Sequence, residues 1–254
     1  MSVNSSESNS TRSTVSLPHK ILFSIGYLAW VSAAFFAAQI SVAVVARWAS
    51  ESRLIDLTHI KQSVLTWIIA FISYALALTI IIGVPWLIKK QRTTLGDLGM
   101  TRLPSWSDIL LGPLAYIPYI IISGLLASVA ATIPGFPINQ VQDVGFSEIL
   151  TRSDMVLAFL TLVVLAPIAE EAIFRGYLYS KLKGITSPVI GAVLVSICFG
   201  ALHLQLNVAV DVFALSLVLC LLRNVTGSIW AGVLLHMTKN FVAFYVLFVD
   251  PLLH

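Results

Sequence analysis

Long apolar runs separated by short polar stretches dominate the chain and predict membrane-spanning helices. A helix needs about 20 predominantly apolar residues to cross the hydrocarbon core of a bilayer. Such runs lie at about 21–46, 64–88, 107–132, 155–182, 187–204, 207–222 and 228–249. The predicted fold class is therefore all-α, a polytopic transmembrane helix bundle of about seven spans, with a range of six to eight.

The C-terminal runs leave more than one arrangement open. The fourth run is long and interrupted by charge, and only the polar patch HLQLN separates the fifth run from the sixth. Tilted or re-entrant segments fit this pattern as well as straight spans do. Pro113, Pro118 and Pro167 lie inside or beside apolar runs, where they predict kinks or helix starts that neighbouring helices can tolerate.

Polarity divides the chain into three parts. Residues 1–20 are rich in Ser, Thr and Asn and predict a disordered polar tail. The apolar run that follows is too long for the hydrophobic region of a signal peptide, so we interpret it as the first span. Residues 21–149 then form the N-terminal transmembrane helices, and residues 150–249 form a transmembrane core that carries the candidate chemistry.

Composition places the chain among integral membrane proteins. Hydrophobic residues make up 58% of the chain and charged residues 11%, against about 25% charged residues in a soluble domain. The net charge of +3 is a property of the loops, so we expect the lipid bilayer as a partner and no nucleic acid. Cys198 and Cys220 lie in apolar runs without CxxC spacing, which indicates buried hydrophobic side chains.

Basic residues are unequally distributed between the two predicted sides of the membrane. The side of the N-terminus holds Arg12, Lys20, Lys89, Lys90, Arg92, Arg102, Arg175, Lys181, Lys183 and Arg223, and the other side holds Arg47, Arg53, Lys61 and Arg152. Because cytoplasmic loops carry an excess of Lys and Arg, this difference predicts a cytoplasmic N-terminus.

Two adjacent carboxylates interrupt the run LVVLAPIAEEAIFRGYLY. A charge near the centre of a membrane helix costs about 2.5 kcal/mol or more, and such residues usually mark function. Counted from one side of the membrane, Glu170 lies at a depth of roughly 20 Å, His203 at roughly 24 Å, His236 at roughly 14 Å and Asn240 at roughly 20 Å. Four polar groups from three spans are therefore expected in one layer.

Spacing within the helices separates the two carboxylates. Glu171 and Arg175 are four residues apart, which predicts a salt bridge on one helix face. Glu170 is rotated from Glu171 by about 100° and remains free to point elsewhere. Phe199 and His203 repeat the interval of four, so an aromatic ring is expected beside the imidazole.

Three motifs occur in order: E-E-x-x-x-R from Glu170 to Arg175, F-x-x-x-H ending at His203, and H-x-x-x-N ending at Asn240. Together they resemble the CPBP family of intramembrane proteases, which groups the CAAX prenyl endopeptidases of the Rce1 type with bacterial bacteriocin-processing and self-immunity (Abi) proteins. The resemblance covers about residues 150–245, and the stretch TTLGDLGM at 93–100 is also similar to the family. It implies an intramembrane endopeptidase in a prokaryotic cell membrane.

The resemblance implies roles for the candidate residues that suit peptide hydrolysis. Glu170 and His203 would hold and deprotonate a water molecule, and His236 and Asn240 would donate hydrogen bonds to the oxyanion. The supporting residues are Glu171, Arg175 and Phe199. In this favoured, glutamate-type mechanism no cofactor is required. A metallo-type alternative makes Glu170, His203 and His236 ligands of zinc, although HExxH spacing is absent.

Other functions and roles stay open. The substrate would be a membrane-associated protein or peptide, of either the CAAX type or a peptide-maturation type. A non-proteolytic bacteriocin self-immunity or scaffold protein could use the same fold. A small-solute transporter is disfavoured, because the polar groups cluster in the C-terminal half without a matching repeat in the N-terminal half. Asp211 and Lys239 are the other charges inside spans, and they either pair with each other or contact substrate.

Overall fold

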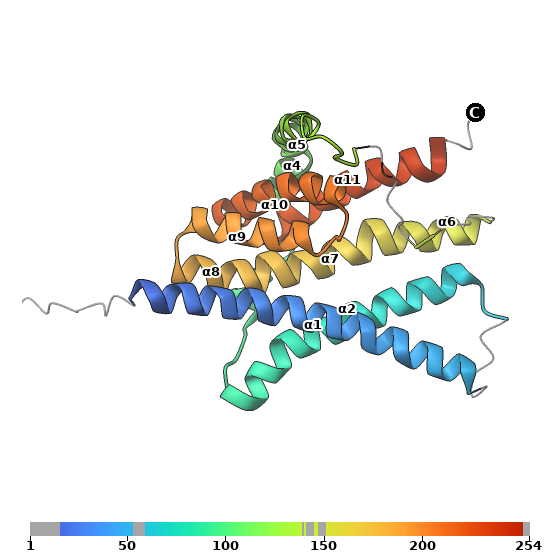
Figure 1. Ribbon diagram of the computed structural model, residues 1–254, viewed down its shortest axis with the longest axis horizontal. Coiled ribbons are helices and arrows are strands. Elements are labelled where there is room, and N and C mark those ends of the chain that lie inside the picture. The colour runs from blue at the N-terminus through green and yellow to red at the C-terminus, as the bar shows by residue number, and fades with distance from the viewer. Residues whose placement is uncertain (1–15, 53–58, 139, 141–144, 147–150, 251–254) are drawn as a thin grey trace, which may run out of the picture.

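The structure is a computed structural model that describes residues 16–52, 59–138, 140, 145–146 and 151–250. All regular elements of these residues are helical, and none is a β-strand. Figure 1 shows most of the helices side by side along the longest axis, with the chain end near residue 249 opposite the start of the first helix. The predicted all-α bundle is confirmed.

The helices follow one another along the chain with short connections. The N-terminal half contains α1 (Leu17–Glu51), α2 (Gln62–Lys89), α3 (Leu95–Leu98), α4 (Trp106–Leu114) and α5 (Tyr116–Ala130). The C-terminal half contains α6 (Arg152–Phe159), η1 (Leu160–Leu165), α7 (Ala166–Glu170), η2 (Glu171–Leu178), α8 (Tyr179–Ile185), α9 (Pro188–Ala201), α10 (Leu206–Thr226), α11 (Trp230–Phe244) and η3 (Tyr245–Val249). The η segments are π-helical, with hydrogen bonds that reach back five residues instead of four. Residues 152–185 form one continuous helix in which π-helical and α-helical segments alternate.

Among the described residues, seven helical segments match the seven predicted spans one to one. Six are long and apolar enough to cross a membrane: Leu17–Glu51, Gln62–Lys89, Trp106–Ala130, Arg152–Ile185, Leu206–Thr226 and Trp230–Val249. The seventh, α9, is apolar but has only 14 residues. It rises about 21 Å, which is less than the hydrocarbon core of about 30 Å. The prediction of about seven spans is confirmed, with a short fifth helix.

The first helix begins earlier than the sequence predicts. It starts at Leu17 with Pro18 in its first turn, where the missing N–H of proline has no helical partner to lose. Residues 17–20 of the predicted polar tail are therefore helical. Residues 1–15 of that tail lie outside the described residues.

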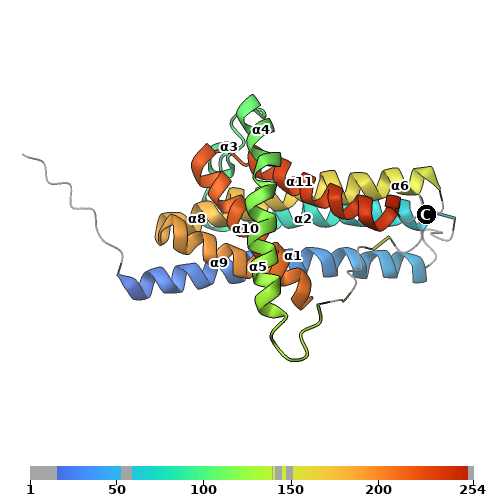
Figure 2. The same cartoon turned by 90° about the horizontal axis from the view of Figure 1, so that it is seen from above.

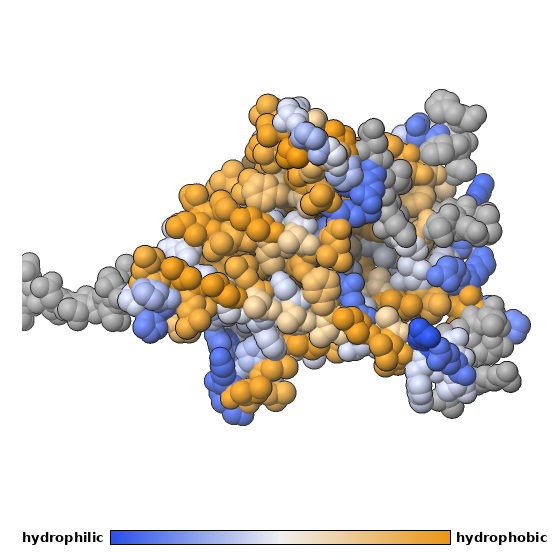
Figure 3. Space-filling model, in the orientation of Figure 1, coloured by the Kyte–Doolittle hydropathy of each residue, from blue (hydrophilic) through white to orange (hydrophobic). Residues whose placement is uncertain are grey.

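Apolar side chains cover the outside of the molecule. Only 17% of the most apolar window is buried in α1, in α2 and in the span Trp106–Ala130, against 56% in α10. Figure 3 shows hydrophobic residues over much of the visible face. A soluble monomer rarely exposes a contiguous apolar patch larger than a few hundred Å². The chain is an integral multi-pass membrane protein, with α10 near its centre.

The three prolines lie at helix starts or breaks, as predicted. Pro113 precedes the end of α4, and Pro118 lies in the first turn of α5. Pro167 lies in the first turn of α7, directly after the π-helical segment η1. Because proline has no N–H to donate, the hydrogen-bond pattern of the helix is interrupted at this point. The interruption lies one turn before the paired carboxylates.

Helix α5 crosses the other helices instead of running parallel to them (Figure 2). It packs on α10, while α4 packs on α11. Gly112 of α4 allows the closest approach. A Cβ atom there would lie 2.6 Å from Cβ of Leu234 and 3.0 Å from the carbonyl oxygen of Ala231, both on α11. Since α11 also carries His236 and Asn240, this contact helps to position the candidate site.

Replacing Gly112 with Ala is expected to destabilise the protein by about 1–3 kcal/mol, because the added methyl group overlaps α11. The matched control is Gly124→Ala in α5, where nothing lies within 4 Å of an added Cβ. That change should be neutral or stabilising by up to about 1 kcal/mol, since alanine favours helix. Thermal unfolding of the purified proteins in detergent measures both changes. Equal midpoints for the two variants would contradict the predicted close packing.

The stretch TTLGDLGM forms α3 and the loop that attaches it to the core. Thr94 and Asp97 form a capping box, with the Thr94 N–H donating to the Asp97 carboxylate at 2.8 Å. This hydrogen bond and that of the Thr94 hydroxyl lower the pKa of Asp97 below its usual value. Gly99 adopts φ +70°, and a Cβ there would lie 2.7 Å from the guanidinium carbon of Arg223. Glycine is therefore needed at this position.

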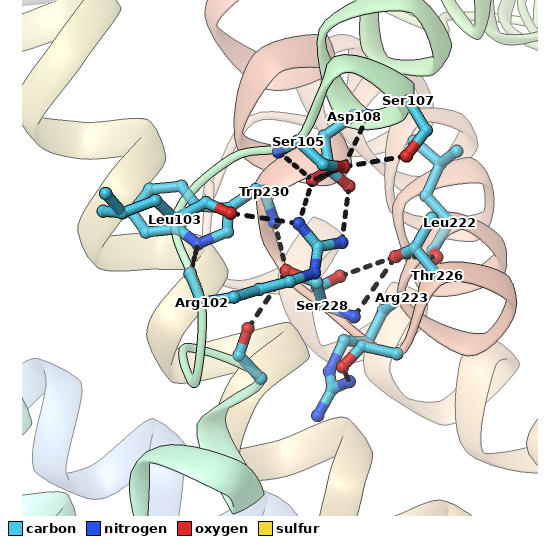
Figure 4. A network of polar contacts seen from close by, with 12 residues as sticks. Arg102, Leu103, Ser105, Ser107, Asp108, Leu222, Arg223, Thr226, Ser228 and Trp230 are labelled. Carbon is cyan, nitrogen blue, oxygen red and sulfur yellow. Dashed lines mark hydrogen bonds and ion pairs between the residues drawn. The ribbon is translucent and has the colours of Figure 1, made fainter.

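Polar contacts fasten the same loop to the turn between α10 and α11 (Figure 4). The carbonyl of Gly99 accepts hydrogen bonds from the Ser228 hydroxyl and from the Ile229 N–H, both at 3.2 Å. Arg102 forms an ion pair with the buried Asp108 of α4, and its carbonyl accepts a hydrogen bond from the Trp230 indole at 2.6 Å. These contacts hold the start of α11 against the N-terminal half of the chain.

Candidate active site

One cavity brings together the four candidate side chains. Glu170 lies at the end of α7, His203 lies in the turn after α9, and His236 and Asn240 lie on α11. All four line a cavity of about 480 Å³ whose other walls come mainly from α2, α11 and α1. The remaining lining is largely apolar, which is typical of small-molecule and peptide sites. The convergence expected from helix depths is therefore present in the structure.

Glu171 is buried between Arg175 and His236. Its Oε1 accepts a hydrogen bond from Arg175 Nη1 at 3.1 Å, and both side chains are fully buried. The salt bridge predicted from their spacing is confirmed. The same oxygen lies 3.1 Å from Nδ1 of His236, a contact that the sequence analysis did not predict. Because an ionised carboxylate can only accept, Nδ1 of His236 is the donor.

Arg175 also contacts the aromatic ring that was predicted beside His203. Its guanidinium carbon lies 4.4 Å from the ring centroid of Phe199, a cation–π geometry. The Phe199 ring meets the His203 imidazole edge to face, with centroids 4.9 Å apart and planes at 77°. The aromatic side chain therefore separates the buried ion pair from the histidine at the cavity wall.

Glu170 points away from Glu171 and into the cavity, as the helical rotation predicts. Its side chain is 12% exposed, and its Oε2 lies 3.8 Å from Nε2 of His236. That distance is longer than a hydrogen bond. Its Oε1 accepts a hydrogen bond of 2.6 Å from the hydroxyl of Tyr74 on α2. One carboxylate oxygen is thus held by a tyrosine, and the other faces a histidine.

His203 is fixed through one ring nitrogen. Its Nδ1 lies 2.8 Å from the carbonyl oxygen of Phe199. A carbonyl can only accept, so Nδ1 carries the proton, and the neutral ring presents Nε2 as an acceptor. Asn240 is held in a similar way, since its Nδ2 donates to the carbonyl of Leu162 in η1 at 2.8 Å. This bond leaves the second amide hydrogen of Asn240 for a ligand.

Residues 152–242 match the family described as Type II CAAX prenyl endopeptidase Rce1-like. This segment is Rce1-like. The resemblance proposed from the three motifs is thereby confirmed over these residues. A protein of Escherichia coli named "Uncharacterized 24.3 kDa protein" is 33% identical to this chain over 89 residues, which are 33% of this chain. The match covers about two fifths (41%) of that protein's length. No solved structure matches the chain.

The Rce1-like segment contains all seven candidate residues, but it does not contain the whole cavity wall. Tyr74 and Gln39, from α2 and α1, line the cavity outside the matched residues. Sequence analysis missed both of them. The available signal was weak: a polar side chain at mid-span in each of the first two apolar runs. Depth counting of the kind applied to the histidines would have placed Tyr74 near Glu170.

The two remaining charges within spans pair with each other. Lys239 Nζ lies 3.4 Å from Oδ2 of Asp211. The other oxygen of Asp211 accepts hydrogen bonds of 2.6 Å from the hydroxyls of Tyr119 and Ser123 on α5. The predicted structural pairing is confirmed. Lys239 also lines the cavity of the Rce1-like segment, so its ammonium group contributes positive charge near the candidate site.

The zinc alternative names Glu170, His203 and His236 as ligands. Within the part of the chain that the structure describes, no group of three or more His, Cys, Asp or Glu side chains is placed to hold a metal ion. Glu170 has one oxygen bound to Tyr74, and both histidines have Nδ1 engaged by protein groups. These bonds leave Oε2 of the glutamate and Nε2 of each histidine free.

Proposed function

We propose that the protein is an intramembrane endopeptidase of the glutamate type, which hydrolyses a peptide bond in a membrane-associated protein or peptide. The observation that carries this proposal is that Glu170, His203, His236 and Asn240, all from the Rce1-like segment, line one cavity. Peptide hydrolysis needs a general base, a water molecule and donors for the oxyanion. The cavity offers groups for each role.

Glu170 and His203 are proposed to activate the water. The free oxygen of Glu170 faces the cavity, and Nε2 of His203 is an acceptor because Nδ1 holds its proton against Phe199. A water between these two acceptors would donate one hydrogen bond to each. Transfer of a proton to Glu170 would then generate the nucleophile, and the protonated Glu170 would return the proton to the leaving amine.

His236 and Asn240 are proposed to stabilise the oxyanion. The carboxylate of Glu171 holds Nδ1 of His236 and so fixes the ring with Nε2 toward the cavity, where an N–H at Nε2 would donate to the oxyanion. Asn240 adds its second amide hydrogen. One donor of this kind contributes about 2.7–4 kcal/mol to the transition state.

We propose that this mechanism requires no cofactor. The support is that protein groups can fill each role: Glu170 and His203 offer acceptors for a water molecule, and Asn240 has a free amide hydrogen for the oxyanion. Turnover should therefore be insensitive to EDTA and to 1,10-phenanthroline. Loss of activity with a chelator, and recovery on adding zinc, would overturn this part of the proposal.

We also propose a class of substrate and an orientation of the protein in the membrane. The CAAX type and the peptide-maturation type both fit a cavity with mainly apolar walls, and the excess of basic residues on one side supports a cytoplasmic N-terminus. The start of α2, the start of the 152–185 helix and the C-terminal end of the helix that follows α10 lie at the same end of the bundle (Figure 1). Cavity residues Thr66 and Leu247 lie near that end, which under this topology is the non-cytoplasmic side.

Comparative peptidomics tests the function and identifies substrates together. Cells carrying the wild type are compared with cells carrying Glu170→Ala at equal membrane levels, and the control is Glu51→Ala, whose side chain is exposed on α1 and pairs with Arg47. Peptides that accumulate as precursors in Glu170→Ala cells alone are the expected result. Unchanged peptides, with a cellular phenotype that survives Glu170→Ala, would favour a non-proteolytic self-immunity or scaffold protein.

A further inference from the structure

The hydroxyl of Tyr74 donates a hydrogen bond to the carboxylate of Glu170. The bond is 2.6 Å long and joins two residues that are 96 positions apart in the chain and lie on different helices. Tyr74 belongs to α2, outside the residues that match the Rce1-like family. The N-terminal half therefore contributes a polar group to the same cavity as the candidate residues of the C-terminal half.

A glutamate side chain needs such a donor to keep one orientation. The last torsion of glutamate is broad, so staggered rotamers do not fix the plane of the carboxylate. His236 Nε2 lies only 3.8 Å from the second oxygen, and a small rotation would close that gap into a direct ion pair. With Oε1 held by Tyr74, Oε2 stays available to the water molecule that is proposed to lie between Glu170 and His203.

The phenol ring is itself positioned by aromatic packing. The Phe35 ring of α1 lies 6.2 Å from the Tyr74 ring and 6.2 Å from the Phe174 ring of η2, measured between centroids. Phe174 in turn meets Phe199 at 4.8 Å. A continuous aromatic wall thus runs from α2 through α1 to the helix that carries the paired carboxylates.

We infer that Tyr74 is a positioning residue of the proposed protease site, which fixes the carboxylate of Glu170 with one oxygen turned to the cavity. Its role in turnover rests on the proposed function, whereas its bond to Glu170 does not. The N-terminal helices α1 and α2 accordingly complete the site, and the Rce1-like segment alone is an incomplete catalytic unit.

A double-mutant cycle on thermal unfolding tests the bond without a substrate. Tyr74→Phe removes one hydroxyl, and Glu170→Met removes the acceptor at similar volume. A hydrogen bond to a charged group is among the stronger kinds, so Tyr74→Phe should lower the unfolding midpoint by about 5 °C in the wild type. In the Glu170→Met protein the same change should have no effect or raise the midpoint.

The matched control for the cycle is Tyr119→Phe, which removes a phenol that donates to Asp211 instead. Its effect should be the same with Glu170 or with Met at position 170. If Tyr74→Phe lowers the midpoint equally in both backgrounds, Tyr74 acts by packing and the inference is wrong. If Tyr74→Phe folds only together with Glu170→Met, the bond is supported. If neither Tyr74→Phe nor the double variant Tyr74→Phe, Glu170→Met folds, Tyr74 acts by packing and the inference is wrong.

Kinetics then test positioning, with a substrate taken from the peptidomic comparison. Tyr74→Phe should lower kcat about tenfold or more with KM changed less than twofold, and Tyr119→Phe should leave kcat unchanged. A normal kcat for Tyr74→Phe beside an inactive Glu170→Gln would overturn the inference but not the protease function. Full cleavage by Glu170→Gln would overturn the protease function, while the unfolding cycle still decides the bond.

Discussion

Replacing Glu170 with Gln is expected to slow cleavage by about two to four orders of magnitude, with little change in KM. Glutamine keeps the length of the side chain and can still accept the hydrogen bond from Tyr74, but it cannot take a proton from water. General base catalysis contributes about 10²- to 10⁴-fold to the rate of an enzymatic reaction. Steady-state cleavage by the purified protein in lipid nanodiscs measures this loss.

The control for this measurement is Glu51→Gln, because Glu51 is exposed on α1 and pairs with Arg47 on the same helix. That variant should cleave at the wild-type rate. A Glu170→Gln protein that retains more than a tenth of the wild-type kcat would rule out Glu170 as the general base.

Replacing Arg175 with Met is expected to lower the free energy of unfolding by about 3–5 kcal/mol. Both Arg175 and Glu171 are fully buried, so the loss of the guanidinium leaves a carboxylate whose remaining partner is His236. Removing one partner of a buried ion pair destabilises a protein by that amount. In a protein of this size the unfolding midpoint should fall by about 10 °C.

The double variant Glu171→Gln, Arg175→Met separates charge from packing. Replacement of both members of a buried pair by neutral groups is often tolerated, because neither charge is then left alone. The double variant should therefore unfold at a higher temperature than Arg175→Met. Additive destabilisation by the two changes would show that the pair contributes mainly through packing.

Much of the fold follows from the sequence because a bilayer permits few solutions. Backbone polar groups must be satisfied inside the membrane, so each apolar run of sufficient length becomes a helix. All seven predicted runs are helices. The exact ends were less predictable: helix α1 extends to Leu17, and α9 ends at Ala201. Those ends depend on Pro18 and on the turn that carries His203, which are local features that hydropathy does not encode.

The candidate site was predictable where contacts lie within one helix or the turn directly after it. The interval from Glu171 to Arg175 fixes their salt bridge, and the interval from Phe199 to His203 fixes their ring contact. The contacts of Glu171 with His236 and of Glu170 with Tyr74 join different helices. Helical spacing gives the depth of a residue in the membrane but does not identify its neighbour across a helix interface. These partners could therefore be identified only from the structure.

Asn240 shows a further limit of periodicity. The family resemblance gave its amide the role of an oxyanion donor, and the structure binds one of the two amide hydrogens to the carbonyl of Leu162. Leu162 lies in η1, where the wider hydrogen-bond pattern alters which carbonyls face the bundle. A reading based on 3.6 residues per turn does not anticipate such a segment.

The π-helical segments on either side of α7 also determine which changes of length the central helix tolerates. A π-helical turn accommodates about one residue more than an α-helical turn. Deleting one residue within 160–165 would therefore convert η1 to ordinary helix without rotating the residues before it relative to Glu170, whereas a deletion in an α-helical stretch would rotate them by about 100°. In ordinary helix the carbonyl of Leu162 would accept a bond from its own helix, and Asn240 would lose its partner although every named side chain of the site would still be present. The wider hydrogen-bond pattern of η1, and not only the residues of the site, is a requirement of this site.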